Sequence, residues 1–213
     1  MNLKIKFLLF SLCLVAAFSG ASAGDTVKKA FANAPFEVVP TISPNVRLDM
    51  IDYFEHGMAR PSSSYFGDDI MLLALDSLSL TFQTSAQCTT SIYVVSEPKD
   101  TLYFVVDTYR LPVTDSNVKV YDTSWNLKAT LQPGYIEDWI NNDGKKEKKF
   151  ADIENAVSFI TAKAVVDPAT ATVTYSNTTA DRVSPEEYAP VEKYIKPERQ
   201  FSFNGKSFKE ITR

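Results

Sequence analysis

The sequence is poor in the residues on which most catalytic and metal sites depend. Its 213 residues include one histidine, His56, so a Ser-His-Asp or Cys-His constellation would have to use it. A zinc site built from several histidines is excluded for the same reason. His56 stands just before the predicted end of a helix, where a partly charged imidazole interacts favourably with the helix dipole. We take this structural role as sufficient, and we predict no catalytic residue and no metal ligand.

Glycine is also scarce, with seven residues in the whole chain. None of them forms a G-x-G motif or a phosphate-binding loop, so we predict no nucleotide and no other cofactor. The run Asn141–Gly144 resembles the middle of a calcium-binding EF-hand loop. Trp139 and Phe150 would then occupy the first and twelfth positions, where carboxylates are required, so the match fails.

Basic residues gather in one short stretch, Lys145–Lys149, of a chain with a formal net charge of −4. Nucleic-acid binding requires a basic face that neutralises many phosphates. The sequence therefore excludes nucleic acid as an expected partner.

The N-terminus, residues 1–23, has the pattern of a secretory signal. Two lysines precede the apolar run Phe7–Phe18, which is short for a membrane span, and a small-residue A-x-A pattern follows. We predict signal cleavage between Ala23 and Gly24. No later stretch is long and apolar enough to span a bilayer, so we expect no transmembrane segment after signal removal.

Signal removal would leave Cys88 as the one cysteine, because Cys13 lies inside the apolar run. No disulfide within the chain would then form, and an exported chain of this kind relies on its core for stability. Cys88 is interpreted as a small residue flanking a strand, with a free reactive thiol as the alternative.

The strongest structural signal is the segment Ser91–Tyr109, which predicts a β-hairpin with a Pro98 turn. Both of its strands alternate between two apolar sets, such as Ile92 with Val94 and Tyr93 with Val95. A strand that is apolar on both sides is covered on both sides. The hairpin is therefore predicted to form the centre of a sheet.

Two helices are predicted before this hairpin, over residues 25–34 and from Ser43-Pro44 to Gly57. The linking residues 36–40 are expected to be extended. The second helix is expected to bury Val46, Leu48, Ile51 and Phe54. Its opposite, exposed face is expected to carry Arg47, Asp49, Asp52 and Glu55, with local ion pairs between Arg47 and the aspartates.

The second half of the chain begins after a polar stretch, Asn141–Lys149, which is interpreted as a surface loop or linker. A second hairpin is predicted from residues 156–166 and 171–177, nearer the periphery of the sheet because one of its faces is polar. A helix opened by Ser184-Pro185 and a hairpin across Asn204-Gly205 complete the chain.

Together these elements predict an α+β fold, an antiparallel β-meander sheet with a few short helices packed on it. Two hairpins with related turns also fit a chain of two similar halves. The first half would span residues 24–140 with the central meander, and the second would span residues 150–213. The two halves are either separate or one continuous domain.

Candidate binding residues are few. Trp125 and Trp139 are candidates for stacking on a sugar ring or anchoring an interface, with a place at the rim of the core as the structural alternative. The pairs Asp49 with Asp52, and Asp68 with Asp69, are candidate carboxylates for glycoside hydrolysis. The sequence does not give the distance between the two carboxylates of a pair, so these aspartates remain candidates and no catalytic role is assigned to them.

Two motifs support a family resemblance: Arg47-Leu48-Asp49-Met50-Ile51-Asp52-Tyr53 in the second predicted helix, and Lys196-Pro197-Glu198 before the terminal strand. Over nearly the whole mature chain the sequence resembles the uncharacterised exported family catalogued as domain of unknown function 3256, from Bacteroidales-type gut bacteria. The resemblance implies a periplasmic or cell-surface location in a Gram-negative bacterium. It also implies candidate O-glycosylation at Asp-Ser/Thr-aliphatic triplets, here Thr26, Ser77 and Thr101.

The sequence therefore favours a non-enzymatic binding or accessory module of the periplasm or cell surface, whose partner is an envelope protein or a glycan. The alternative is a small carboxylate-dependent hydrolase that acts on envelope or dietary glycans.

Overall fold

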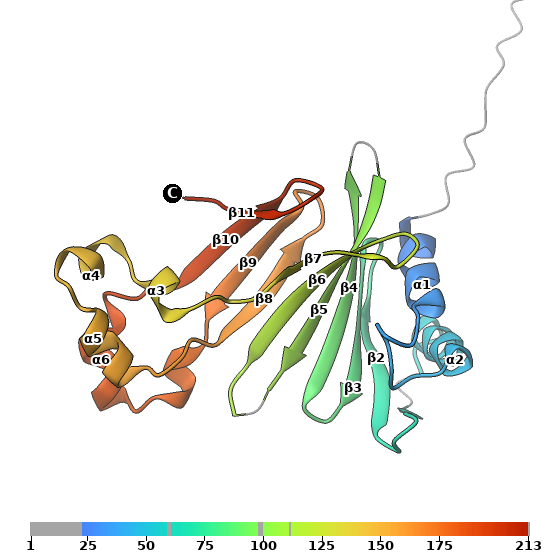
Figure 1. The fold of residues 1–213 in the computed structure, drawn as a ribbon. Helices are drawn as coiled ribbons and strands as arrows, with labels where there is room; N and C mark the ends of the chain where they lie inside the picture. Colours follow the sequence, from blue (N-terminus) through green and yellow to red (C-terminus); the bar gives the residue numbers. More distant parts are fainter. Residues whose placement is uncertain (1–22, 59–60, 98–99, 111, 213) are drawn as a thin grey trace, which may run out of the picture.

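Two antiparallel sheets and several short helices make up the part of the chain that the structure describes (Figure 1). The structure is a computed structural model, and it describes residues 23–58, 61–97, 100–110 and 112–212. Residues 1–22 of the predicted signal and Pro98 of the predicted turn lie outside the described residues. No helix in the described ranges is long and apolar enough to cross a bilayer.

The first sheet is a seven-stranded meander in which each strand pairs with the next one along the chain. The helices α1 (Ala23–Asn33) and α2 (Pro44–Glu55) precede it. Its strands are β1 (Ser62–Ser63), β2 (Asp69–Leu75), β3 (Ser79–Ser85), β4 (Cys88–Glu97), β5 (Asp100–Tyr109), β6 (Asp115–Asp122) and β7 (Leu127–Leu131). The predicted α+β class with an antiparallel meander is confirmed.

The predicted central hairpin is the β4–β5 pair. Its register runs from Cys88 opposite Tyr109 to Glu97 opposite Asp100. Ile92 and Phe104 are both fully buried, and they belong to two different core clusters on opposite faces of the sheet. The prediction that both faces of this hairpin are covered is therefore confirmed.

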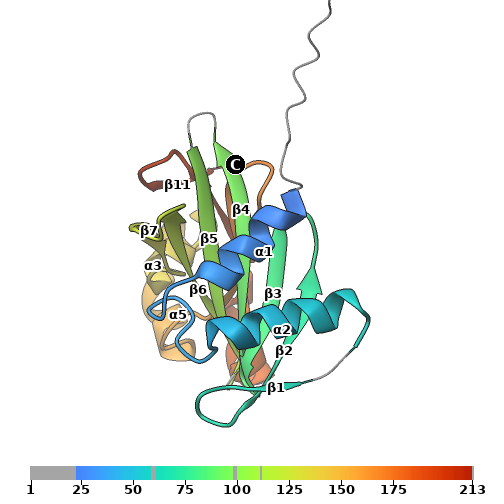
Figure 2. The ribbon, with the colours of Figure 1, turned by 90° about the vertical axis from the view of Figure 1, so that its right-hand side faces the viewer.

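Helices α1 and α2 cover one face of the first sheet (Figure 2). Val27 and Phe31 of α1 are fully buried against this face, and the Phe31 ring lies 4.6 Å from the Phe82 ring of β3. From α2, Met50 and Ile51 enter the same core. A fully buried side chain of this size contributes about 1.5–3 kcal/mol, so this layer depends on a small number of large residues.

A second sheet of four strands, in the order β11-β10-β9-β8, packs on the other face (Figure 1). Its strands are β8 (Ala162–Asp167), β9 (Thr172–Asn177), β10 (Glu198–Phe203) and β11 (Phe208–Glu210). The Phe203 ring of β10 meets the Phe104 ring of β5 edge-on, with centroids 5.6 Å apart. One apolar cluster therefore includes side chains from both predicted halves.

Two expectations about the second hairpin are wrong. It belongs to this separate sheet, not to the periphery of the meander. Its first strand begins at Ala162 and not at residue 156, because residue 156 ends the helix α5 (Phe150–Ala156), whose Ile153 is fully buried, and residues 157–161 form no strand. Apolar spacing alone does not separate a short buried helix from a strand. The acid-proline turn itself is confirmed, since Asp167 pairs with Thr172 across it.

The polar stretch that was expected to be a loop or linker contains the helix α4 (Asn142–Lys146). The Asn141 side chain accepts hydrogen bonds from the amides of Asp143 and Gly144 at 3.1 and 3.0 Å, and so caps the helix. Gly144 is buried against Ile140 and Tyr194. The neighbouring helices are α3 (Ile136–Trp139) and α6 (Pro185–Glu192), the latter capped by Ser184 as predicted.

Helix α2 is rotated relative to the expected apolar face. Leu48 is 56% exposed, whereas Arg47 is buried with Met50 and Ile51. Arg47 forms none of the expected ion pairs with the aspartates of α2; its guanidinium donates to the backbone carbonyls of Phe31, Ala34, Val39 and Ile42. The segment at residues 36–40, expected to be extended, is a series of turns, and it supplies one of these acceptors, the Val39 carbonyl.

Candidate functional site

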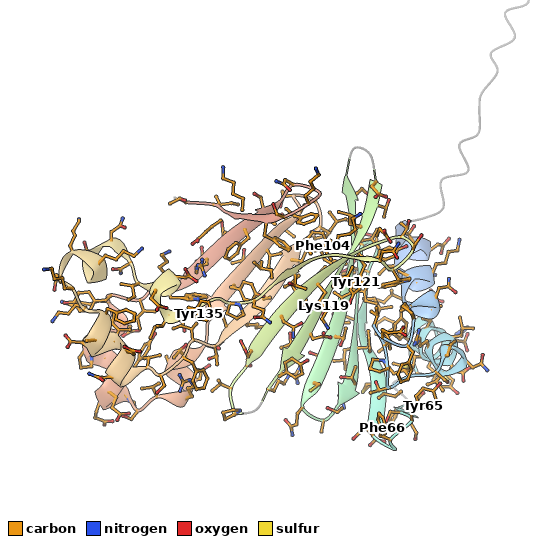
Figure 3. All side chains as sticks on the ribbon, viewed as in Figure 1. Tyr65, Phe66, Phe104, Lys119, Tyr121 and Tyr135 are labelled. Atoms are coloured by element: carbon orange, nitrogen blue, oxygen red, sulfur yellow. The ribbon has the colours of Figure 1, made fainter. Side chains whose placement is uncertain are left out.

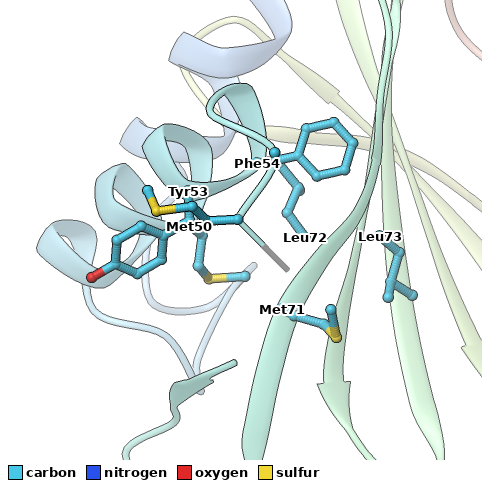
Figure 4. A pocket seen from close by; sticks show the side chains of 8 residues that line it. Met50, Tyr53, Phe54, Met71, Leu72 and Leu73 are labelled. Atoms are coloured by element: carbon cyan, nitrogen blue, oxygen red, sulfur yellow. The ribbon is translucent and has the colours of Figure 1, made fainter. Parts of the chain in front are cut away.

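An apolar groove of about 350 Å³ lies between α2 and β2 (Figure 4). Its lining combines side chains of the second half of α2, the residues directly after it, and the middle of β2. These residues are Met50, Tyr53, Phe54, Gly57, Met58, Met71, Leu72 and Leu73. Three of the eight are methionines, whose flexible, polarizable side chains adapt to partners of different shape.

Local sequence signals place α2 across β2. Ser43 caps the N-terminus by accepting from the Val46 amide at 3.4 Å, and Pro44 occupies the first helical turn. At the other end Gly57 adopts a φ of 68°, which glycine reaches without steric cost. The Met58 amide then donates to the Tyr53 carbonyl at 2.8 Å. This turn brings Met58 back over the end of the helix and into the groove lining.

A β-bulge in β2 orients the other wall. Leu72 pairs with Phe82 and Ala74 pairs with Thr81, so Leu73 has no partner residue on β3. A bulge bends a strand and redirects the side chain of the extra residue. Leu73 is 39% exposed and lines the groove. The groove therefore has an apolar rim that is accessible from outside.

Acidic residues of α2 stand beside this apolar lining. Asp49 and Asp52, two of the sequence-predicted binding residues, are exposed and are not part of the lining. The Asp52 carboxylate lies 3.2 Å from Nδ1 of His56. The carbonyl of Asp52 accepts from the same ring, and with the Asp52 charge it raises the pKa of His56. Glu55 forms an ion pair of 2.9 Å with Lys28 of α1.

A second, polar cleft of about 320 Å³ lies on the helix side of the first sheet, where the turns at residues 37–41 meet β3–β6. Asp107 accepts a hydrogen bond of 2.8 Å from Thr90 and lies 3.4 Å from Nζ of Lys119. Cys88, which is partly exposed, and Tyr109 also line this cleft. The alternation of β5 puts Asp107 and Tyr109 on the same face as Val105, but no sequence spacing linked them to Lys119.

The two predicted tryptophans lie in different places. Trp139 is 0% exposed, and its Nε1 donates to the Pro133 carbonyl at 2.8 Å, so neither ring face is open to a sugar. Trp125 is half-buried at a φ of 64°, with its ring 4.8 Å from that of Tyr103 and 5.6 Å from that of Tyr121. Trp139 therefore belongs to one core cluster, and Trp125 packs against the other.

The predicted carboxylate pairs are not gathered in one cavity. The lining of the groove includes none of the four aspartates, and the lining of the polar cleft includes Asp68 alone. Asp69 begins β2 and is exposed. No group of three or more His, Cys, Asp or Glu side chains within the described ranges is arranged to hold a metal ion.

The remaining predicted positions lie on or near the first sheet. Thr26 is in α1, Ser77 is exposed in the turn between β2 and β3, and Thr101 is near the start of β5. The predicted cleavage site, Ala23 and Gly24, coincides with the first residues of α1. Glycosylation and cleavage at these positions stay predictions.

The fold defines an α+β protein in which a helical layer, a seven-stranded sheet and a four-stranded sheet are stacked in that order (Figures 1 and 2). The chain belongs to the family described as "Protein of unknown function (DUF3256)", whose family model matches residues 20–208. This confirms the resemblance seen in the sequence.

Among solved structures, the chain is similar to a domain of an uncharacterized protein from Porphyromonas gingivalis W83. The TM-score is 0.69 at 19% sequence identity, and the match covers 87% of this chain and 98% of the other. At this identity the similarity shows a shared fold. No curated protein matches the chain.

Proposed function

We propose that this protein is an exported, non-enzymatic binding module of the periplasm or cell surface of a Gram-negative bacterium. Its groove between α2 and β2 docks a protein of the cell envelope. The observation that carries the proposal is the groove itself, which combines three methionines, a partly exposed Leu73 and an acidic surround. The signal-like sequence at residues 1–23 supports export.

The chemistry of the lining favours a protein partner over a sugar. Covering the groove would remove apolar surface from water, which contributes about 25 cal/mol per Å². Sugar recognition depends on several hydrogen-bonding groups, and among the residues that line the groove Tyr53 alone has a hydroxyl, amide or charged side-chain group. A small carboxylate-dependent hydrolase receives less support, because the candidate aspartates lie outside the groove and Asp68 alone reaches the polar cleft.

A matched pair of leucines on two different strands provides the test. Leu73 of β2 lines the groove at 39% exposure, and Leu127 of β7 is 56% exposed on the opposite edge of the same sheet. For this test the full chain is given a C-terminal tag and is expressed in a Gram-negative bacterium. Envelope proteins are captured by wild type, Leu73→Lys and Leu127→Lys, after circular dichroism has shown that each variant is folded.

We expect an envelope protein that is captured by wild type and Leu127→Lys and is lost with Leu73→Lys. If Leu73→Lys does not fold, Met58→Lys, at a lining residue that follows α2, replaces it. Capture that is equal for all variants would contradict the proposal. So would the absence of any captured protein combined with binding to a glycan array that both leucine variants retain.

A further inference from the structure

The edge of β2 differs from the other sheet edges of the described structure. The edge strands β7, β8 and β11 each contain a lysine, which are Lys128, Lys163 and Lys209. Charged residues on an edge strand discourage pairing with another chain. Residues 71–75 of β2 read Met-Leu-Leu-Ala-Leu, without a charge or a proline. This stretch of the edge therefore lacks the charged residue that the other three have.

This edge is also open along most of its length. The short strand β1 pairs with β2 at Asp69 and Ile70 only. From Met71 to Leu75, β2 pairs with β3 on one side and with no other strand among the described residues. Backbone amides and carbonyls that face outward from an edge strand are a template for a further strand. Five residues match the usual length of a short strand.

The apolar groove adjoins this same edge. Met71, Leu72 and Leu73 of β2 belong to its lining, and Met50 and Phe54 of α2 form the facing wall (Figure 4). Side chains of an added strand would alternate between the two faces of the sheet. Those on the helix side would enter the groove, while the backbone paired with β2. The edge and the groove can therefore bind one extended segment together.

The charges around the edge indicate the chemistry of that segment. Asp69 and Asp76 flank the open part of β2 along the chain, and α2 adds Asp49, Asp52 and Glu55. Among the described residues, Lys28 pairs with Asp25 and Glu55, and the His56 ring lies beside the Asp52 carboxylate. If a second copy of this chain paired through β2, the acidic residues around the two edges would come close together. Their mutual repulsion would oppose association. A basic segment would be attracted.

We infer that β2 accepts an added β-strand from a partner protein, formed by an extended segment in which apolar residues alternate with lysine or arginine. This inference rests on the proposed function, because it specifies how the partner would occupy the groove. Backbone hydrogen bonds to residues 71–75 supply affinity, and the alternating apolar side chains supply the fit.

Synthetic peptides test the inference directly. The probe is a fluorescein-labelled, eight-residue peptide of alternating lysine and valine, titrated with the full chain and followed by fluorescence anisotropy. Two further peptides carry the same side chains but are N-methylated on all valines or on all lysines. Alternate amides of a strand point to the same side. Strand addition therefore predicts that one methylated peptide loses at least about tenfold in affinity and the other keeps it.

Three further measurements complete the design. Leu73→Lys is expected to weaken binding of the parent peptide, and Leu127→Lys is expected to leave it unchanged. A peptide with glutamate in place of lysine is expected not to bind. Sedimentation of wild type and Leu73→Lys reports self-association.

Each failure has a distinct meaning. Equal binding of both methylated peptides and the parent would overturn strand addition while the groove proposal stands. Absence of peptide binding, with envelope capture that still depends on Leu73, would do the same. A dimer that dissociates in Leu73→Lys would overturn the inference in favour of a second copy. Capture that is insensitive to Leu73 overturns the proposed function itself.

Discussion

The guanidinium of Arg47 on α2 donates a hydrogen bond of 2.9 Å from Nη2 to the carbonyl oxygen of Val39. The same group also donates to the carbonyl of Ile42 at 2.9 Å and to those of Phe31 and Ala34, where α1 ends. Burial lowers the pKa of this guanidinium. Arg47 thus donates to four carbonyls at the end of α1 and in the segment that joins α1 to α2, and it ties α2 to that segment.

Replacement of Arg47 is expected to be severely destabilising. In Arg47→Met the side chain keeps much of its length but donates nothing, so several buried carbonyls lose their donor. Each unsatisfied buried group costs about 1–3 kcal/mol, so we expect a loss of at least about 3 kcal/mol in the free energy of unfolding. Arg47→Lys should retain part of the stability, because an ammonium reaches fewer of these acceptors. Urea denaturation followed by circular dichroism measures both.

Asp49→Asn is the matched control on the same helix, since Asp49 is exposed, and we expect a change within about 0.5 kcal/mol. A similar, small effect of Arg47→Met would show that water replaces the guanidinium at the carbonyls, and it would contradict the role assigned to Arg47.

The hairpin β4–β5 was predictable from the sequence, and Arg47 was not, for physical reasons. The hairpin is defined by local alternation, and Ile92 and Phe104 show it clearly. Arg47 was predicted to be exposed to solvent, because charged side chains are rarely buried without a partner. Its partners are backbone carbonyls, which carry no residue-specific signal, and they lie up to 16 residues away in the chain.

The candidate site shows the same limit. Gly57 was a predictable helix stop, and it does position one end of the groove. The exposure of Leu73 depends on a β-bulge in β2. A single sequence does not show where one strand of a pair contains an extra residue. Strand alternation also leaves open which of two sheets a hairpin joins, so the second sheet beneath Phe104 was missed.

Gly144 provides a prediction in which the sign of the effect is informative. A Cβ at this position would lie 2.7 Å from Cγ2 of Ile140 and 3.1 Å from Cβ of Tyr194. Alanine in an unpacked helix would stabilise it by about 1 kcal/mol relative to glycine. Because this contact is too close, we expect Gly144→Ala to destabilise the protein by about 1–3 kcal/mol instead.

Thermal denaturation measures the effect, and Lys145→Ala, an exposed change in the same helix, serves as the control. If Gly144→Ala raises the melting temperature, the packing of α4 against Tyr194 is not as described, and this stretch is closer to the loop that the sequence suggested.

His56 makes the last prediction unusually direct, because it is the one histidine in the chain and gives one imidazole signal by NMR. Its pKa is raised above the ordinary value of 6.5, first by the hydrogen bond to the Asp52 carbonyl and second by the Asp52 charge. A histidine whose folded pKa is raised contributes stability below its unfolded pKa, and this contribution is lost as the pH rises through the folded pKa. The imidazole and the carboxylate are both more than half exposed, so this contribution is small.

A pH titration of the imidazole protons is therefore expected to give a midpoint above 6.5 in the wild type. In Asp52→Asn the midpoint should fall toward that value without reaching it, because the carbonyl of residue 52 still accepts from the ring. In Asp49→Asn it should stay near the wild-type midpoint, since Asp49 is not among the groups that raise the pKa of His56. A wild-type midpoint at or below 6.5, or equal midpoints in wild type and Asp52→Asn, would remove the assigned contact between His56 and Asp52.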